Sequence, residues 1–247
     1  MENWEKSIRI IQQYEPISVI VSSYVSPILL RKGYHVAFSG GKDSIVIYDL
    51  VKKAKVKHQA YFAITTVDPP ELLKFIRLFF PEVKWLHPQL SMYKLIIKKG
   101  VPLRPNKISG GRYCCEYLKE YAGIGEFVIL GVRWEESLKR KKTRKLYEVD
   151  TRKKMKGKRY LNPIIDWSEQ EVWKYIKDNA LPYPELYDCG MKRIGCIGCP
   201  MAYYKTRQGN LINILSLKLC ILRQSVNAWK RDFLKDLKMN MMFTSGG

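Results

Sequence analysis

Short apolar runs alternate along the chain with segments whose apolar residues recur every three or four positions. Such runs are typical of buried strands, and the periodic segments are typical of helices that bury one face. Strands that alternate with helices predict an α/β fold with a doubly wound parallel sheet. The four strands predicted in this way are Tyr34–Phe38, Gln59–Thr65, Val83–Leu86 and Phe127–Gly131.

Proline and capping residues mark the predicted helices. Pro69 and Pro70 favour the first turn of a helix after the second strand. Ser168 with Glu171 three residues later forms a capping box, which predicts a helix that ends near Asn179. Further helices are expected within 1–33, over Glu116–Tyr121 and in the tail from Leu211 to Leu237.

The charge of the chain adds a candidate partner. Lys and Arg number 44 against 23 Asp and Glu, a net charge of +21. This excess favours a polyanion such as nucleic acid, or a phosphate-rich ligand. Residues 133–160 hold thirteen basic and four acidic side chains with little apolar periodicity. We interpret them as an exposed, mobile loop that contacts nucleic acid or phosphate, with a merely solvated face as the alternative.

The N-terminal residues lack the cationic and apolar regions of a signal peptide. The uncharged stretch Pro16–Leu30 contains two prolines and is too short for a membrane helix, so a buried helix is expected there. We therefore expect a cytoplasmic protein with no membrane contact.

A glycine-rich segment joins the first predicted strand to the helix that follows it. It reads Ser39, Gly40, Gly41, Lys42, Asp43, Ser44. Glycines let backbone N–H groups approach a phosphate, and a helix N-terminus favours an anion. Lys42 would neutralise a phosphate charge, and Asp43 would help to hold Mg²⁺ on the same oxygens. We interpret the segment as a nucleotide site; a glycine-rich turn without a ligand is the alternative.

This spacing is not that of a Walker A loop. It resembles the PP-loop of the ATP pyrophosphatases, which cleave between the α- and β-phosphates. The resemblance implies an adenine nucleotide alpha hydrolase-like fold and adenylation chemistry, with Lys42 and Asp43 as the catalytic residues. We divide the chain accordingly into a helical lead-in (1–33), a nucleotide-binding domain (34–185) and a cysteine knuckle with a C-terminal helical extension (186–247).

Four of the six cysteines form two close pairs. Cys114 and Cys115 are adjacent, and Cys196 and Cys199 form a C-x-x-C next to glycines. Four thiolates suit an iron–sulfur cluster or a zinc ion, and both remain open on spacing alone. Cys189 is a candidate persulfide carrier, with coincidence as the favoured alternative. Cys220, on an apolar helix, is expected to be an unreactive buried thiol.

Several further stretches occur in an order and at a spacing known from one family. They are Arg112–Cys115 with Lys119, Gly131–Arg133 with Ser137 and Arg140, Asn162–Pro163, Asp166–Trp167, Val172–Trp173, Leu181–Tyr183 and Gly195–Cys199. On these stretches, over roughly residues 34–200, the chain resembles the phosphoadenosine phosphosulfate (PAPS) reductase family.

The resemblance implies roles for particular side chains. In cluster-bearing adenylyl-sulfate reductases the twin cysteines and the C-x-x-C bind a [4Fe–4S] cluster, which implies the same of the four cysteines here. The resemblance to the PP-loop fold implies that Asp68, at the end of the second strand, lies near the adenosine and contacts its ribose, with a helix N-cap as the alternative. The residues implied to contact the phosphate or sulfate end of the substrate are Lys119, Arg133, Ser137 and Arg140.

Two departures from the reductases change the expected function. The reductases carry a Glu-Cys-Gly-(x)-His segment near their C-terminus, whereas the sequence here ends Met239–Gly247 and has no histidine after His87. The loop also keeps Lys42 and Asp43, as in ATP-splitting relatives, although many reductases have lost the lysine. We therefore expect an ATP-dependent adenylating enzyme of sulfur metabolism that transfers sulfur to tRNA or DNA, with a sulfur or electron donor protein as a further partner.

Two alternatives stay open. The first is a reductase of adenylyl sulfate or PAPS whose nucleophile comes from another residue or protein. The second is a basic nucleic-acid-binding module with a structural metal, against which the intact phosphate loop argues.

Overall fold

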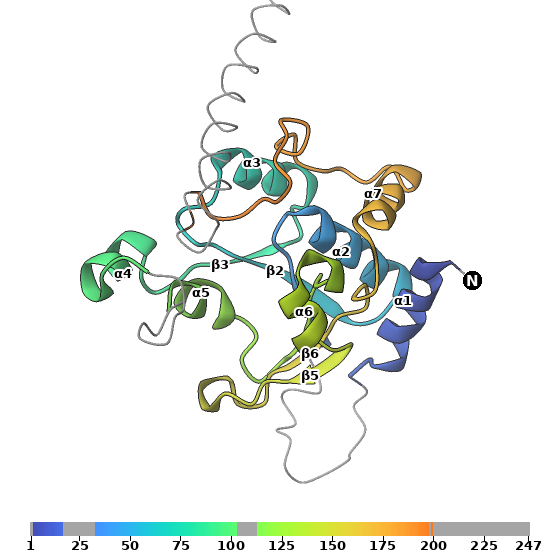
Figure 1. Cartoon of the computed structure of the whole chain (residues 1–247), viewed down its shortest axis with the longest axis horizontal. Coiled ribbons are helices and arrows are strands. Elements are labelled where there is room, and N and C mark those ends of the chain that lie inside the picture. Colours follow the sequence, from blue (N-terminus) through green and yellow to red (C-terminus); the bar gives the residue numbers. More distant parts are fainter. Residues whose placement is uncertain (1, 17–32, 103–112, 198, 200–247) are drawn as a thin grey trace, which may run out of the picture.

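A six-stranded sheet forms the centre of the computed structural model, which describes residues 2–16, 33–102, 113–197 and 199 (Figure 1). The strand order is β3-β2-β1-β4-β6-β5. Neighbouring strands run parallel, except that β5 pairs antiparallel with β6 at one edge. The strands are β1 (Tyr34–Ala37), β2 (His58–Ala63), β3 (Lys84–Leu86), β4 (Phe127–Ile129), β5 (Tyr147–Val149) and β6 (Arg159–Leu161).

The basic segment 133–160 is not the mobile loop that we expected. It supplies two strands of the sheet, β5 and β6, together with three helical turns. Met155 and Tyr160 of this segment are buried, as is Leu161, the residue that ends β6. The charged residues within and beside these two strands, such as Glu148 and Arg159, interrupt the apolar run that would have predicted them. The helical turns are η3 (Trp134–Glu136), α6 (Leu138–Thr143) and η4 (Lys153–Met155).

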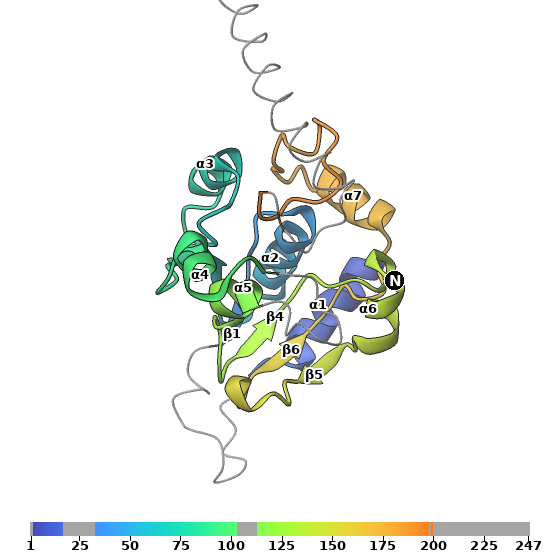
Figure 2. The same cartoon turned by 60° about the vertical axis from the view of Figure 1, so that its left-hand side comes forward.

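Helices cover the sheet, and α1, α2 and α7 lie side by side in two views (Figures 1 and 2). The hydroxyl of Tyr175 on α7 donates to Asp49 of α2 at 2.6 Å. The predicted capping box of Ser168 and Glu171 is present at the start of α7, and α3 begins at Pro70 as predicted. Apart from η3, α6 and η4, the helices of the described residues are α1 (Asn3–Gln13), α2 (Lys42–Ala54), α3 (Pro70–Phe79), α4 (Met92–Lys99), α5 (Tyr113–Cys115), the π-helical turn η2 (Glu116–Glu120) and α7 (Glu169–Asp178).

The core lies between the sheet and these helices. Val36 of β1 and Ile129 of β4 are fully buried, as are Ile47 and Leu50 of α2. Burial of each such side chain contributes about 1.5–3 kcal/mol of transfer free energy. No helix in the described ranges is long and apolar enough to cross a membrane. Most of the stretch Pro16–Leu30 and the predicted tail helix lie outside the described residues.

The strand order reverses between β1 and β4. From β1 the chain adds β2 and β3 on one side, whereas β4 lies on the other side. Open α/β sheets bind their ligands at such a switch point, beyond the carboxyl ends of the strands. Here β1 leads into Ser39–Ser44, and Gly131 after β4 lies against the backbone of Asp43. A Cβ atom on Gly131 would meet the Asp43 carbonyl carbon and oxygen at 2.9 Å.

This close approach predicts the effect of a single methyl group. Gly131→Ala is expected to lower the free energy of unfolding by about 1–3 kcal/mol, because backbone must shift to accept the side chain. Gly195→Ala is the matched control, since a Cβ at that position meets nothing within 4 Å. Urea denaturation of both variants and the wild type measures the difference. Equal stability of the two variants would contradict the packing described for Gly131.

Candidate functional site

The loop Ser39–Ser44 is a preformed turn at the N-terminus of α2. Gly40 has a φ of +70°, and a side chain there would meet Leu72 and Ile76 of α3 at 2.7 and 2.8 Å. Ser44 holds the turn together, because its hydroxyl donates to the Gly41 carbonyl at 2.8 Å and accepts the Ser39 amide at 3.2 Å. Glycine is thus required at position 40 by its positive φ and by the packing of α3.

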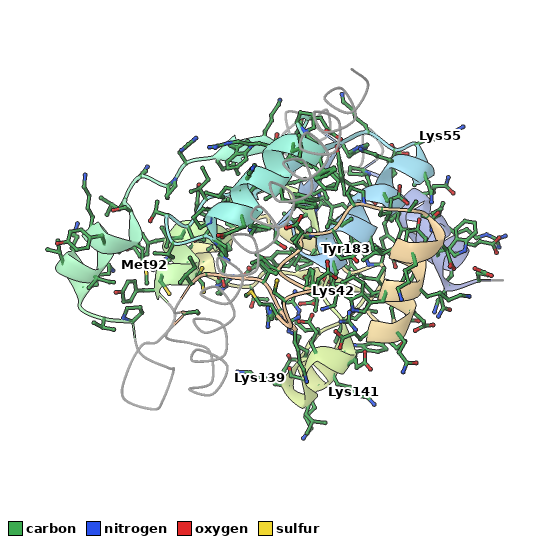
Figure 3. The ribbon with its side chains drawn as sticks, turned by 90° about the horizontal axis from the view of Figure 1, so that it is seen from above. Lys42, Lys55, Met92, Lys139, Lys141 and Tyr183 are labelled. Carbon is green, nitrogen blue, oxygen red and sulfur yellow. The ribbon has the colours of Figure 1, made fainter. Side chains whose placement is uncertain are left out.

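Lys42 is buried, and its side chain is turned towards α7 and the segment after it (Figure 3). Its Nζ lies 3.2 Å from Oε1 of Glu169 and 3.1 Å from the carbonyl oxygen of Lys192. The same ammonium lies 5.2 Å from the ring centre of Tyr187 and 5.9 Å from that of Trp173. A carboxylate, a carbonyl and two ring faces therefore compensate the buried charge.

Asp43 forms an ion pair with a buried arginine. Nε of Arg133 donates to Oδ1 of Asp43 at 2.6 Å, and its Nη1 donates to Glu135 at 2.9 Å. Burial lowers the pKa of Arg133, but the charge of Asp43 and the hydrogen bond to it outweigh burial and raise the pKa. The guanidinium thus stays charged, and it joins the loop after β1 to the segment after β4.

Further basic side chains surround Glu136. Arg140 pairs with one of its oxygens, and Nη1 of Arg193 lies 3.8 Å from the other. Burial lowers the pKa of Arg140, and the charge of Arg193 lowers it further. Ser137 is the N-cap of α6 and accepts the Arg140 amide at 3.2 Å. We call Arg133, Arg140 and Arg193 the arginine group.

The arginine group includes two of the residues predicted to bind the anionic end of a substrate. Ser137 lies beside them as a helix cap, and its side chain is engaged with α6. Lys119 is exposed on η2, and within the described residues it makes no hydrogen bond or ion pair that connects it to Arg133 or Arg140. Arg193 was not predicted, because its place beside Glu136 depends on the fold of the segment after α7.

The turn Thr65–Asp68, which follows β2, positions Asp68. Oδ2 of Asp68 accepts the Thr65 amide at 2.7 Å, which closes the turn. The N-cap of α3 is Pro69, so the alternative interpretation of Asp68 as a helix N-cap is wrong. Proline has no side-chain acceptor, and the carboxylate of Asp68 is turned back to Thr65 instead. Its predicted contact with an adenosine stays a prediction.

Both cysteine pairs approach this turn. The thiol of Cys196 donates to Oγ1 of Thr65 at 3.4 Å. Next to it, the amide of Ile197 donates to the Val67 carbonyl at 2.8 Å. Val67 also packs against the small apolar cluster that contains Cys114, with Cys115 at its edge. Two segments far apart in the sequence, one with Cys114 and Cys115 and one with Cys196, therefore meet at the turn Thr65–Asp68.

The four thiols of Cys114, Cys115, Cys196 and Cys199 are suitable ligands for a soft metal, but they are not gathered closely enough to bind one ion. Burial raises the pKa of Cys114 to about 11, and the negative charges of Cys115 and Cys199 add to the shift. Among the described residues, no three Cys, His, Asp or Glu side chains form a group that could hold a metal ion. Four thiolates fit an iron–sulfur cluster or zinc by donor type, so the metal centre stays a prediction.

The partners of Lys42 were not predicted from the sequence. Glu169, Trp173, Tyr187 and Lys192 lie more than 120 positions from the loop, and their spacing suggests no shared site. Glu169, Trp173 and Tyr187 also line a depression of about 650 Å³ beside α7, together with Tyr183. Cys189 lies nearby and is half-buried against the core, whereas Cys220 lies outside the described residues.

Comparison with known sequences identifies relatives. A family model described as the phosphoadenosine phosphosulfate reductase domain matches residues 33–202. The adenosine 5'-phosphosulfate reductase of Oceanobacillus iheyensis is 30% identical over 178 residues, which are 66% of this chain and 69% of the relative. An uncharacterized protein of Methanocaldococcus jannaschii is 30% identical over 203 residues, 78% of this chain. The chain spans about half of that relative, at 48%.

Solved structures share the fold. The PAPS reductase of Candida auris, determined as a phosphate complex, has a TM-score of 0.53 and 22% identity, over 77% of this chain and 88% of that one. The FMN adenylyltransferase of Candida glabrata, in complex with FAD and pyrophosphate, has a TM-score of 0.51 and 14% identity, over 78% and 64%. These likenesses confirm the predicted PP-loop α/β fold. Because the family model spans most of the chain, from β1 with its loop to the C-x-x-C, the chain belongs to the phosphoadenosine phosphosulfate reductase domain family.

Proposed function

We propose that this chain is an ATP-dependent adenylating enzyme of sulfur metabolism that transfers sulfur to a nucleic acid. The nucleotide would bind at Ser39–Ser44, with its phosphates at the N-terminus of α2. Lys42 and Arg133 supply positive charge at this position, and Asp43 supplies a carboxylate. A Mg²⁺ ion held by Asp43 would neutralise charge on the phosphates. The attacking group of the acceptor would reach the α-phosphate from the side of the arginine group.

A set of exposed lysines on α6 supports the proposal that the acceptor is a nucleic acid. Lys139, Lys141 and Lys142 have no acidic partner among the described residues, and they lie on the helix that follows Arg133. Lys139 and Lys141 lie at the periphery of the molecule (Figure 3). By contrast, Lys154 pairs with Glu116 at 2.8 Å. A phosphate backbone that crosses α6 would lead one of its nucleotides towards the loop.

A second candidate is reduction of adenylyl sulfate. It is favoured by the likeness to the Oceanobacillus iheyensis adenosine 5'-phosphosulfate reductase over two thirds of each chain. The same arginine group would then hold the sulfate, and a thiol would take the sulfonate from the phosphate oxygen and release AMP. A thiol donor then reduces that thiosulfonate and releases sulfite. The intact Lys42–Asp43 pair and the lysines of α6 favour the first candidate.

Lys42 tests the nucleotide site. We expect Lys42→Ala to weaken ATP binding by about 10- to 100-fold, because a hydrogen bond to a charged group is lost. Lys52→Ala is the matched control on the same helix, since Lys52 pairs with Glu82 at 2.6 Å away from the loop. Isothermal titration with ATP measures both variants, and melting temperatures check their folding. Wild-type affinity in Lys42→Ala would contradict the loop assignment.

The cysteines test the metal centre that we propose. Anaerobically purified protein is expected to hold about four iron and four sulfide per chain on Cys114, Cys115, Cys196 and Cys199. Cys196→Ser should lose iron, whereas Cys189→Ser should keep it. Loading should weaken as the pH falls, because binding must displace the proton of Cys114, whose pKa is about 11 without metal. Stoichiometric zinc without sulfide would contradict the cluster and leave a zinc site.

The lysines of α6 test the partner. We expect nucleic-acid binding that weakens steeply with salt, and a shallower salt dependence in the triple variant Lys139→Gln, Lys141→Gln, Lys142→Gln. Each lost phosphate contact lowers the slope of log K against log salt by about 0.7–0.9. Lys74→Gln, Lys84→Gln, Lys98→Gln is the control, with the same change of charge at exposed positions elsewhere. ATP affinity should stay unchanged in both.

The products then separate the two candidates. For the adenylating enzyme, tRNA or DNA is expected to release pyrophosphate from ATP as the acceptor is adenylated, and a sulfide donor is then expected to displace AMP from the adenylated acceptor. Sulfite released from adenylyl sulfate with a thiol donor, together with no nucleic-acid affinity near physiological salt, would instead establish the reductase.

A further inference from the structure

The segment Tyr187–Lys192, which we call the strap, contacts the loop at two points. The Lys42 amide donates to the hydroxyl of Tyr187 at 2.9 Å, and Nζ of Lys42 donates to the Lys192 carbonyl at 3.1 Å. A Cβ on Gly41 would lie 3.2 Å from the same hydroxyl. The phenol therefore lies directly against Gly41 and Lys42, where the phosphates of a nucleotide are expected.

The ring of Tyr187 is fixed in this position by its neighbours. It packs edge-on against Trp173 of α7, with ring centres 5.1 Å apart. The ammonium of Lys42 contacts both rings, at 5.2 Å from the ring centre of Tyr187 and 5.9 Å from that of Trp173. Tyr183 packs edge-on against the same Trp173 at 5.3 Å, but its hydroxyl lies near Asp188. Two tyrosines thus share one tryptophan, and only the hydroxyl of Tyr187 reaches the loop.

The hydroxyl of Tyr187 keeps its proton and has no described acceptor for it. Burial raises the pKa of Tyr187, so the group is a neutral O–H across the physiological range. The oxygen of Tyr187 accepts a hydrogen bond from the Lys42 amide, and among the described residues no hydrogen bond uses the proton of the hydroxyl. A phenol that accepts from the loop on one lone pair can donate to an anion held by the same loop.

We propose that Tyr187 is a phosphate-binding residue of the nucleotide site, whose O–H donates to a phosphate oxygen of the nucleotide bound at Ser39–Ser44. This inference rests on the proposed nucleotide site and adds a phosphate-binding residue from outside the loop. The Lys42 amide already donates to the phenol oxygen and does not donate to a phosphate at the same time. The O–H of Tyr187 donates to the phosphate in its place. The strap thus contributes both a donor to the phosphate and an anchor for the lysine.

The test compares Tyr187→Phe with Tyr183→Phe. Both variants keep the ring against Trp173 and lose one hydroxyl. Isothermal titration with ATP and with adenylyl sulfate is expected to show a loss of at least about tenfold in Tyr187→Phe. Tyr183→Phe should stay within twofold of the wild type. Adenosine, which has no phosphate, serves as the second probe in competition experiments and should bind equally to all three proteins.

The outcomes are distinct. A similar loss for adenosine and ATP in Tyr187→Phe would overturn the proposal, because it would show a structural role of the hydroxyl. Unchanged or tighter ATP binding would also overturn it and would mean that the phenol only covers the loop. A wild-type protein that binds neither ATP nor adenylyl sulfate would overturn the nucleotide site itself, a result that the variants alone cannot produce.

Discussion

The ion pair of Asp43 with Arg133 connects the two halves of the sheet. Asp43 follows β1 and Arg133 follows β4, the two strands between which the chain order reverses. The guanidinium is buried, so its charge depends on Asp43 and its neighbours for compensation. Removal of one partner from such a pair leaves an uncompensated buried charge, which is strongly destabilising. The pair therefore fixes the distance between the loop and the arginine group, and with it the shape of the proposed site.

A second constraint gathers the cysteines. The turn Thr65–Asp68 follows β2, next to the loop strand β1 in the sheet, and it binds the C-x-x-C segment through Thr65 and Val67. The neighbouring cluster of Cys114 and Leu118 packs against the same turn. This turn and the loop Ser39–Ser44 lie at the same edge of the sheet, because they follow two adjacent parallel strands.

The sequence predicted those parts of the fold that depend on neighbours in the chain. The strands β1 to β4, the capping box of Ser168 and the turn at Ser39–Ser44 all have local signals. β5 and β6 were missed because charged residues lie within and beside them, whereas β4, which is equally short, lies in a continuous apolar run. Asp43 and Arg133 were each predicted as site residues, but their pairing across 90 positions was not predictable from spacing. The partners of Lys42 were missed for the same reason, since a glutamate, a carbonyl and two rings on distant segments share no motif.

Lys42 is both the lysine of the loop and the anchor of the strap, and this double role has a thermodynamic consequence. Its ammonium is already bound to Glu169 and to the Lys192 carbonyl before any anion arrives. An anion that draws the ammonium towards the loop must weaken those bonds, and linkage makes the effect mutual. The free energy needed to weaken the contacts of Lys42 with Glu169 and Lys192 is therefore subtracted from the binding free energy of such an anion. Lys192 lies four positions before Cys196, so the segment that holds this ammonium leads directly into the C-x-x-C.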